Sequence, residues 1–262
     1  MKFFLAIALL HCVLSTMASP TSPPEDKEID GDGKIVGGYA TDIETVPYIA
    51  ALMYRNRFLC GSSIISENWL LTAAHCTSGG REKYFTVRVG STKHGSGGEV
   101  FEVKEIINHP EYNRATVNND FALIRLNKPM NFSETMQPVH LSELWEPIAL
   151  NSKCTVSGWG ETRDSTESNA SLRSVKVYVL DQEVCRQAYS HFGDIFNENM
   201  VCAGHIGGGK DACFGDSGGP LICEGRHVGV VSWGADCAMP GFPGVYARSA
   251  VIREWIREKT EV

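Results

Sequence analysis

The sequence lacks any apolar run long enough to cross a membrane. Its longest, residues 3–14, is shorter than the about 20 residues that a transmembrane helix requires. Lys2 precedes this run and small residues around Ala18 follow it, which is the pattern of a secretory signal peptide. We therefore expect residues 1–18 to be removed, and the mature protein to be secreted and extracellular, with no membrane partner.

A surplus of basic residues is also missing. The 262 residues include 24 lysines and arginines against 31 acidic residues, a formal net charge of −7. Residues 1–34 hold three of the lysines and five of the acids, so the remainder carries −5. Binding to nucleic acid or to an anionic membrane calls for a basic surface. We expect neither partner.

The cysteines lack the C-x-x-C spacing that is typical of zinc sites. One of the nine, Cys12, lies in the expected signal peptide, and the others are scattered singly. An even number of cysteines in a secreted chain indicates disulfides, but eight cysteines allow about a hundred pairings and their spacing does not choose among them. The eight are Cys60, Cys76, Cys154, Cys185, Cys202, Cys213, Cys223 and Cys237.

What recurs along the chain is short runs rich in β-forming residues, separated by turn signals. Many short strands at this spacing indicate an all-β fold, and the pattern alone does not separate a sandwich from barrels. Residues 129–150 are less regular and predict a linker, and the polar residues 161–171 predict a loop. The apolar residues of 251–259 have helical spacing, so we expect a C-terminal α-helix. The predicted strands are 47–54, 58–64, 84–89, 100–107, 121–126, 154–157, 174–179, 200–202, 220–223, 228–232 and 244–246.

The segment 215–220 (GDSGGP) places Ser217 among residues too small to crowd it. Backbone N–H groups in such a turn can point at a developing oxyanion, and this stabilisation often contributes most to the rate of acyl transfer. A serine hydroxyl needs a base to become a nucleophile, so the segment predicts a histidine and an acid that orients it. A glycine-rich surface turn is the alternative interpretation.

Candidates for both partners occur upstream. His75 lies in the segment 72–76 (TAAHC) and Asp120 in the segment 118–123 (NNDFAL). Taken singly, a structural histidine and a turn carboxylate are the alternatives. The order His, Asp, Ser along the chain favours a catalytic triad.

Together these segments resemble the chymotrypsin-fold serine peptidases, and within that family the trypsins. The resemblance runs from Ile35 to about Ile256. Its motifs are 35–38 (IVGG), 72–76 (TAAHC), 119–123 (NDFAL), 157–160 (SGWG), 211–220 (DACFGDSGGP), 232–234 (SWG) and 243–246 (PGVY). It implies an all-β fold of two antiparallel β-barrels with the active site between them, plus the C-terminal helix. His75 and Asp120 are expected from the first barrel and Ser217 from the second.

The resemblance also assigns roles. Ser217 is the implied nucleophile, His75 the general base and Asp120 the group that orients it, with the N–H groups of Gly215 and Ser217 as the oxyanion hole. No cofactor or metal is implied. The expected partners are protein or peptide substrates and proteinaceous inhibitors, and the expected state is a monomer. The implied disulfides are Cys60–Cys76, Cys154–Cys223, Cys185–Cys202 and Cys213–Cys237.

Specificity follows from the implied substrate pocket. An acid at the pocket base, Asp211, implies cleavage after Arg or Lys, because a buried carboxylate requires a cationic partner. Ala212 stands where the family often has a serine. With one hydroxyl fewer for a lysine ammonium, we expect Arg to be preferred. The remaining implied pocket residues are Ser232, Trp233, Gly234 and Gly244.

The acidic, proline-rich residues 19–34 predict an extended, poorly packing segment. It is either a solvated tail or a propeptide, and the IVGG motif directly after Lys34 favours a propeptide, followed by a peptidase domain at 35–262. The family implies that cleavage after Lys34 frees an ammonium group at Ile35. This group would pair with Asp216 and order the pocket.

Several positions depart from the family or stay open. Phe214 and Asp236 stand where trypsins usually have glutamine and glycine, which is either tolerated variation or a change in subsite preference. Residues 91–99 contain one acid, too few for the calcium loop of vertebrate trypsins. Asn131 and Asn169 begin glycosylation sequons that are either used or unused.

The leading hypothesis is thus a trypsin-like endopeptidase. The short propeptide, with no accessory domain before Lys34, favours a digestive role. The alternatives are a narrow regulatory or venom protease and, in a different class, a non-catalytic homologue that acts as a binding protein.

Overall fold

The computed structural model describes residues 35–162, 170–193 and 195–262. The predicted signal peptide, the predicted propeptide and Asn169 lie outside the described residues. Within the described part of the chain, no helix is long and apolar enough to cross a membrane.

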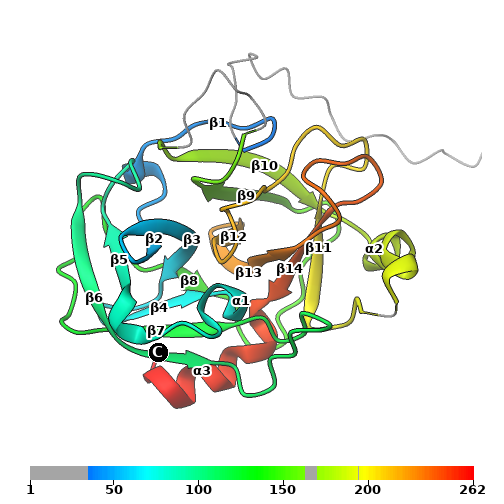
Figure 1. Ribbon diagram of the computed structural model, residues 1–262. Helices are drawn as coiled ribbons and strands as arrows, with labels where there is room; N and C mark the ends of the chain where they lie inside the picture. The colour runs from blue at the N-terminus through cyan, green and yellow to red at the C-terminus, as the bar shows by residue number, and fades with distance from the viewer. Residues whose placement is uncertain (1–34, 163–169, 194) are drawn as a thin grey trace, which may run out of the picture. The chain divides into compact units, whose positions relative to one another are not determined.

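The first half of the chain forms a closed antiparallel barrel of six strands (Figure 1). The order around the barrel is β2-β3-β4-β7-β6-β5, and pairing of β2 with β5 closes it. The strands alternate buried and exposed side chains where one face meets solvent, as in β5. The six strands are β2 (Ile49–Tyr54), β3 (Arg57–Ile64), β4 (Trp69–Thr72), β5 (Phe85–Val89), β6 (Glu99–Asn108) and β7 (Ala122–Leu126).

The second half forms another six-stranded antiparallel ring, in the order β10-β11-β14-β13-β12-β9, closed by the pairing of β9 with β10. Two short strands extend it: β1 (Tyr39–Ala40) pairs with β10, and β8 (His140–Leu141) pairs in parallel with β13. The family fold of two barrels is thus confirmed. The ring strands are β9 (Lys153–Gly158), β10 (Arg173–Val179), β11 (Met200–Gly204), β12 (Pro220–Cys223), β13 (Arg226–Trp233) and β14 (Gly244–Arg248).

The predicted terminal helix is present as a 3-10 turn, η4 (Ser249–Ile252), followed by α3 (Arg253–Thr260). Ile252 and Ile256 are buried in the apolar cluster that also fills the first barrel. The chain therefore ends on the first barrel after completing the second, and α3 ties the two halves together (Figure 1).

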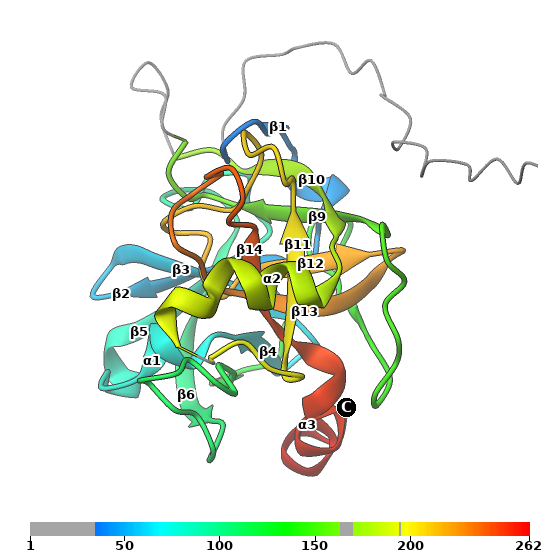
Figure 2. The ribbon, with the colours of Figure 1, turned by 90° about the vertical axis from the view of Figure 1, so that its right-hand side faces the viewer.

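A helix that the strand pattern did not predict, α2 (Gln182–Tyr189), lies beside β11 and β14 (Figure 2). Asp181 caps it by accepting a 2.9 Å hydrogen bond from the Glu183 N–H. The disulfide Cys185–Cys202 ties α2 to β11. The other short helices are α1 (Ala74–Thr77), η1 (Ile43–Thr45), η2 (Glu82–Tyr84) and η3 (Ser190–Phe192).

The two barrels are joined by polar contacts at their interface. The Gly61 N–H on β3 donates a 2.8 Å hydrogen bond to the Ser217 carbonyl in the second half. His227 on β13 is fully buried between Ser63 of β3, 3.1 Å from its Nε2, and Ser249, 2.8 Å from its Nδ1. These contacts fix one barrel against the other beside Ser217.

Candidate active site

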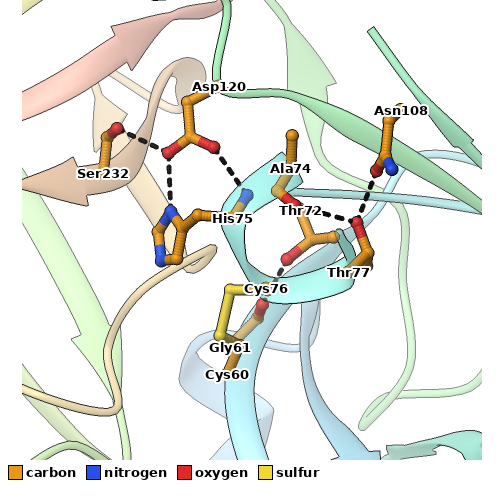
Figure 3. A network of polar contacts seen from close by, with 10 residues as sticks. All are labelled: Cys60, Gly61, Thr72, Ala74, His75, Cys76, Thr77, Asn108, Asp120 and Ser232. Atoms are coloured by element: carbon orange, nitrogen blue, oxygen red, sulfur yellow. Dashed lines mark hydrogen bonds and ion pairs between the residues drawn. A yellow bond between two sulfur atoms is a disulfide. The ribbon is translucent and has the colours of Figure 1, made fainter. Parts of the chain in front are cut away.

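His75 and Asp120 come from neighbouring parts of the first barrel (Figure 3). His75 lies on α1, which the disulfide Cys60–Cys76 ties to β3. Asp120 lies just before β7 and is fully buried. Its Oδ1 accepts the His75 backbone N–H at 2.8 Å, and its Oδ2 lies 2.7 Å from His75 Nδ1. A carboxylate at this contact accepts the hydrogen bond, so Nδ1 carries the proton and Nε2 is free to act as a base.

Ser232, on β13 of the second barrel, donates a 2.6 Å hydrogen bond from its Oγ to Asp120 Oδ2. Sequence reasoning placed Ser232 in the substrate pocket and missed this contact. Ser232 and Asp120 are 112 positions apart, so no local pattern links them. The S-W-G motif, which marks the substrate pocket, was the only signal that pointed to Ser232. Asp120 is therefore held from both barrels.

Ser217 lies in the turn before β12, partly exposed, and belongs to the second barrel. Among the described residues, no hydrogen bond joins its Oγ to His75 Nε2. Hydrogen bonds between a nucleophile and its base often tighten only when substrate binds. The structure thus brings His75 and Asp120 into contact and leaves the Ser217 hydroxyl outside that hydrogen-bonded group.

The backbone N–H groups of Gly215 and Ser217 are the implied oxyanion hole. The Phe214 carbonyl accepts the Glu161 N–H at 2.6 Å, and the Asp216 carbonyl accepts the Gly219 N–H at 2.9 Å. In a trans peptide the N–H points opposite to the C=O. The Gly215 and Ser217 N–H groups therefore face away from these partners, and neither donates a hydrogen bond to another described residue. They are available to a ligand oxygen.

A pocket of about 270 Å³ is lined by both Ser217 and Asp211. Asp211 is 5% exposed, and within the described part of the chain its two oxygens accept only the N–H groups of Ala212 (2.8 Å) and Ala238 (3.0 Å). Burial raises the pKa of this carboxyl to about 6. A cationic side chain in the pocket would restore its charge.

The pocket walls leave space above Asp211. At Gly244 a Cβ atom would lie 2.8 Å from Asp211 Oδ1, so only glycine keeps the carboxylate accessible there. Phe214, which is 65% exposed, and the exposed Asp236 lie at the rim. The implied pocket residues that the structure places in this lining are Asp211, Ala212, Ser232, Trp233, Gly234 and Gly244.

Asp216, next to Ser217, is fully buried. Its oxygens accept the N–H groups of Gly160 and Cys213, both at 2.9 Å, and burial raises its pKa to about 7. A Cβ atom on Gly160 would lie 2.5 Å from the carboxylate, so glycine is required for this approach. Ile35 is 1% exposed and belongs to the core of the second barrel. Lys34 lies outside the described residues.

The described residues form four disulfides: Cys60–Cys76, Cys154–Cys223, Cys185–Cys202 and Cys213–Cys237. They are the pairs that the family resemblance implied. Among the described residues, Cys60, His75 and Cys76 have ligand atoms close enough for a metal. Because the two sulfurs are bonded to each other, neither is a thiolate, and the cluster does not fit a metal. In residues 91–99 the lone acid, Glu99, lies 2.7 Å from Lys128.

Comparison with known proteins agrees with this arrangement. The trypsin family model matches residues 35–256. The chain is 40% identical to trypsin 5G1 of Aedes aegypti, over 97% of this chain and 96% of that protein. It is 36% identical to a trypsin of Phaedon cochleariae over 100% and 99% of the two chains, and 36% identical to a vitellin-degrading protease of Bombyx mori over 92% and 89%.

The fold and these matches define a serine endopeptidase. The chain belongs to the trypsin family.

Proposed function

We propose that this protein is a secreted digestive endopeptidase that hydrolyses peptide bonds after Arg or Lys, with Arg preferred, and is made as a zymogen. The buried Asp211 carboxylate at the base of the pocket carries the proposal. It has no cationic partner among the described residues, and its pocket opens beside Ser217. The proposed organisation is a signal peptide (1–18), a propeptide (19–34) and a peptidase domain (35–262), active as a monomer.

In the proposed reaction, Ser217 Oγ forms a bond to the scissile carbonyl carbon while its proton passes to His75 Nε2. The carbonyl oxygen becomes an oxyanion, which the Gly215 and Ser217 N–H groups stabilise. The C–N bond then breaks, and His75 gives the proton to the leaving amine. Water repeats the sequence on the acyl-enzyme, with Asp120 keeping the imidazole oriented throughout.

The Arg preference rests on what surrounds Asp211. A guanidinium forms two parallel hydrogen bonds to a carboxylate, whereas an ammonium is a compact charge that needs further acceptors. Ala212 lines the pocket without a hydroxyl to supply one. The pocket therefore satisfies an arginine better than a lysine.

Activation is proposed to act on Asp216. Among the described residues its buried carboxylate has two N–H donors and no cation, so ionising it is unfavourable. Cleavage after Lys34 would place an ammonium on Ile35, whose side chain is already buried in the core of the second barrel. Pairing would stabilise the charged Asp216 and, through its neighbours, the turn that carries Gly215 and Ser217.

A digestive role is supported by relatives named as trypsins, and one relative is named a vitellin-degrading protease. Trypsin-like proteases act on proteins and are bound by protein inhibitors. A narrow regulatory or venom protease is the second candidate. A non-catalytic binding protein is disfavoured because His75, Asp120 and Ser217 are all present.

The test is to cut the purified chain after Lys34 and to compare amide hydrolysis after Arg, Lys and Phe, with Ser217→Ala as the matched control. Fast cleavage after Arg that the control lacks supports both the triad and the pocket. Cleavage after Phe alone would retain the triad and reject the Asp211 pocket. Folded, correctly cut protein without any hydrolysis would favour the binding-protein alternative.

A further inference from the structure

A second cavity, of about 280 Å³, lies at the far end of β14 from the substrate pocket. Gly244, Val245 and Tyr246 line the substrate pocket, whereas Arg248, at the end of the same strand, lines this cavity. The two linings share no residue. We call it the Arg248 cavity; its other walls come from Ile148, the end of β10, α2, β11 and the segment 196–198.

Two guanidinium groups line the Arg248 cavity, and their environments differ. Arg186, on α2, is paired: its Nη1 donates a 2.6 Å hydrogen bond to Glu183 Oε2. Arg248 makes no ion pair with any described residue; its Nη2 donates a 3.1 Å hydrogen bond to the Glu146 carbonyl, and its Cζ lies 6.0 Å from the centre of the Trp145 ring. Its Nε is buried and has no hydrogen-bond partner in the described part of the chain.

A half-buried guanidinium without a counter-ion is unfavourable, because burial removes water without supplying an anion. Burial lowers the pKa of Arg248, in keeping with that environment. A carboxylate is the group that best satisfies a guanidinium, through charge-assisted and often paired hydrogen bonds. Arg248 thus provides a recognition point for an anion.

Part of the remaining wall of the cavity is apolar. Phe196 and Met200 are each 4% exposed, and Val179 and Val201 are 3% exposed. The polar Gln182 is already satisfied: its Oε1 accepts the Cys202 N–H, and its Nε2 donates to the Leu180 carbonyl. A ligand in the cavity would therefore meet the Arg248 guanidinium, which has no counter-ion among the described residues, beside these apolar side chains.

One acid, Glu198, also lines the cavity, and it is exposed. Among the described residues, Glu198 forms no ion pair with Arg186 or Arg248. Its negative charge opposes an incoming anion without neutralising Arg248. This makes Glu198 a useful control, because removing it should act in the opposite direction to removing Arg248.

We propose that the Arg248 cavity binds a small organic acid, with its carboxylate against the Arg248 guanidinium and its aryl or alkyl body against Phe196 and Met200. The volume is just below the about 300 Å³ at which ligand pockets commonly begin, so the ligand is small. The site is separate from the peptidase chemistry, and its binding does not depend on the proposed substrate specificity.

The experiment uses full-length protein cut after Lys34, carrying Ser217→Ala, with benzamidine present to fill the substrate pocket. Titration calorimetry compares 3-phenylpropionate with its uncharged amide. The acid is expected to bind at least about 10-fold more tightly than the amide, and Arg248→Met, which keeps the aliphatic stem, should remove that difference.

Two further variants sharpen the test. Glu198→Gln should tighten acid binding several-fold, and Arg186→Gln should change it by less than about 3-fold because that charge is already paired. If Arg248→Met fails to fold, Glu198→Gln and the acid–amide comparison still decide the question. Equal affinity for acid and amide, no binding of the acid, or full acid affinity in folded Arg248→Met would overturn the proposal.

Discussion

Ser232 Oγ donates a 2.6 Å hydrogen bond to Asp120 Oδ2, the same oxygen that lies 2.7 Å from His75 Nδ1. Ser232 also lines the substrate pocket. One side chain of the second barrel therefore holds the carboxylate that contacts His75 of the first barrel. The alignment of the two barrels and the orientation of His75 depend on the same contact.

Ser232→Ala removes a donor from a fully buried carboxylate. Leaving such a group less satisfied costs about 1–3 kcal/mol, and we expect the free energy of unfolding to fall by that amount. Because Asp120 is then held less firmly, kcat/KM should fall about 10-fold. Ser157→Ala is the control, since the Ser157 hydroxyl bonds only Ser174 within the same barrel. An equal loss of kcat/KM in both variants would argue against the positioning role.

Asp211 gives a prediction for pH. Its pKa is raised to about 6, so the carboxylate is charged above pH 6 and increasingly neutral below it. The affinity for benzamidine should therefore decrease as the pH falls through 6, approaching 10-fold per unit. Asp211→Asn should weaken binding by at least about 100-fold and abolish the pH dependence. A wild-type affinity that stays constant from pH 5 to 7 would contradict this account.

Asp216 should make the uncut chain less stable as the pH rises. Its folded-state pKa of about 7 lies above the ordinary aspartate value of 3.8, so the folded state holds the proton more tightly. The stabilisation of the folded state by protonated Asp216 is fully present below pH 4. It is lost progressively as the pH rises to 7, which lowers the free energy of unfolding by about 4 kcal/mol. Thermal unfolding of uncut Ser217→Ala protein measures this loss.

The same measurement on protein cut after Lys34 should show a smaller loss, because the Ile35 ammonium then compensates Asp216. Asp216→Asn in the uncut Ser217→Ala protein should remove the pH dependence, and Asp216→Asn with Ser217 intact should leave the cut protein inactive. Identical pH profiles for the uncut and cut proteins would show that Ile35 and Asp216 do not pair.

The short motifs predicted the family and the fold, because each holds residues that act close together along the chain. Through the resemblance they also implied the four disulfides that the structure contains, but they did not predict other contacts between distant segments. Whether the strands formed a sandwich or barrels depends on closure by β2–β5 and β9–β10, which no local pattern encodes. The Ser232–Asp120 bond and the unpaired Arg248 likewise arise only when separate elements pack.

His227 predicts acid sensitivity of the interface between the barrels. Complete burial lowers its pKa to about 4 from 6.5, so the folded state favours the neutral ring. The stabilisation of the folded state by the neutral His227 ring is fully present above pH 6.5. As the pH falls towards 4 this stabilisation is lost, which lowers the free energy of unfolding by about 3 kcal/mol. Denaturant unfolding of cut Ser217→Ala protein should show the loss. His227→Gln, which cannot ionise, should be less stable at pH 7 but should lack this part of the pH dependence.

Ala212 tests the preference for Arg over Lys. Its side chain lines the pocket and its N–H donates a 2.8 Å hydrogen bond to Asp211 Oδ1, so a hydroxyl added at this position would lie beside the carboxylate. One hydrogen bond to a charged group contributes about 1.5–3 kcal/mol, and the lysine ammonium has donors left over after pairing with Asp211. Ala212→Ser should therefore raise kcat/KM for Lys peptides about 10-fold relative to matched Arg peptides. Ala235→Ser, in the neighbouring exposed loop, is the control and should leave the ratio unchanged. The unmodified enzyme should also be given matched Arg and Lys peptides in one mixture. Faster cleavage after Lys than after Arg would refute the preference for Arg, because the pocket would then satisfy an ammonium without the missing hydroxyl.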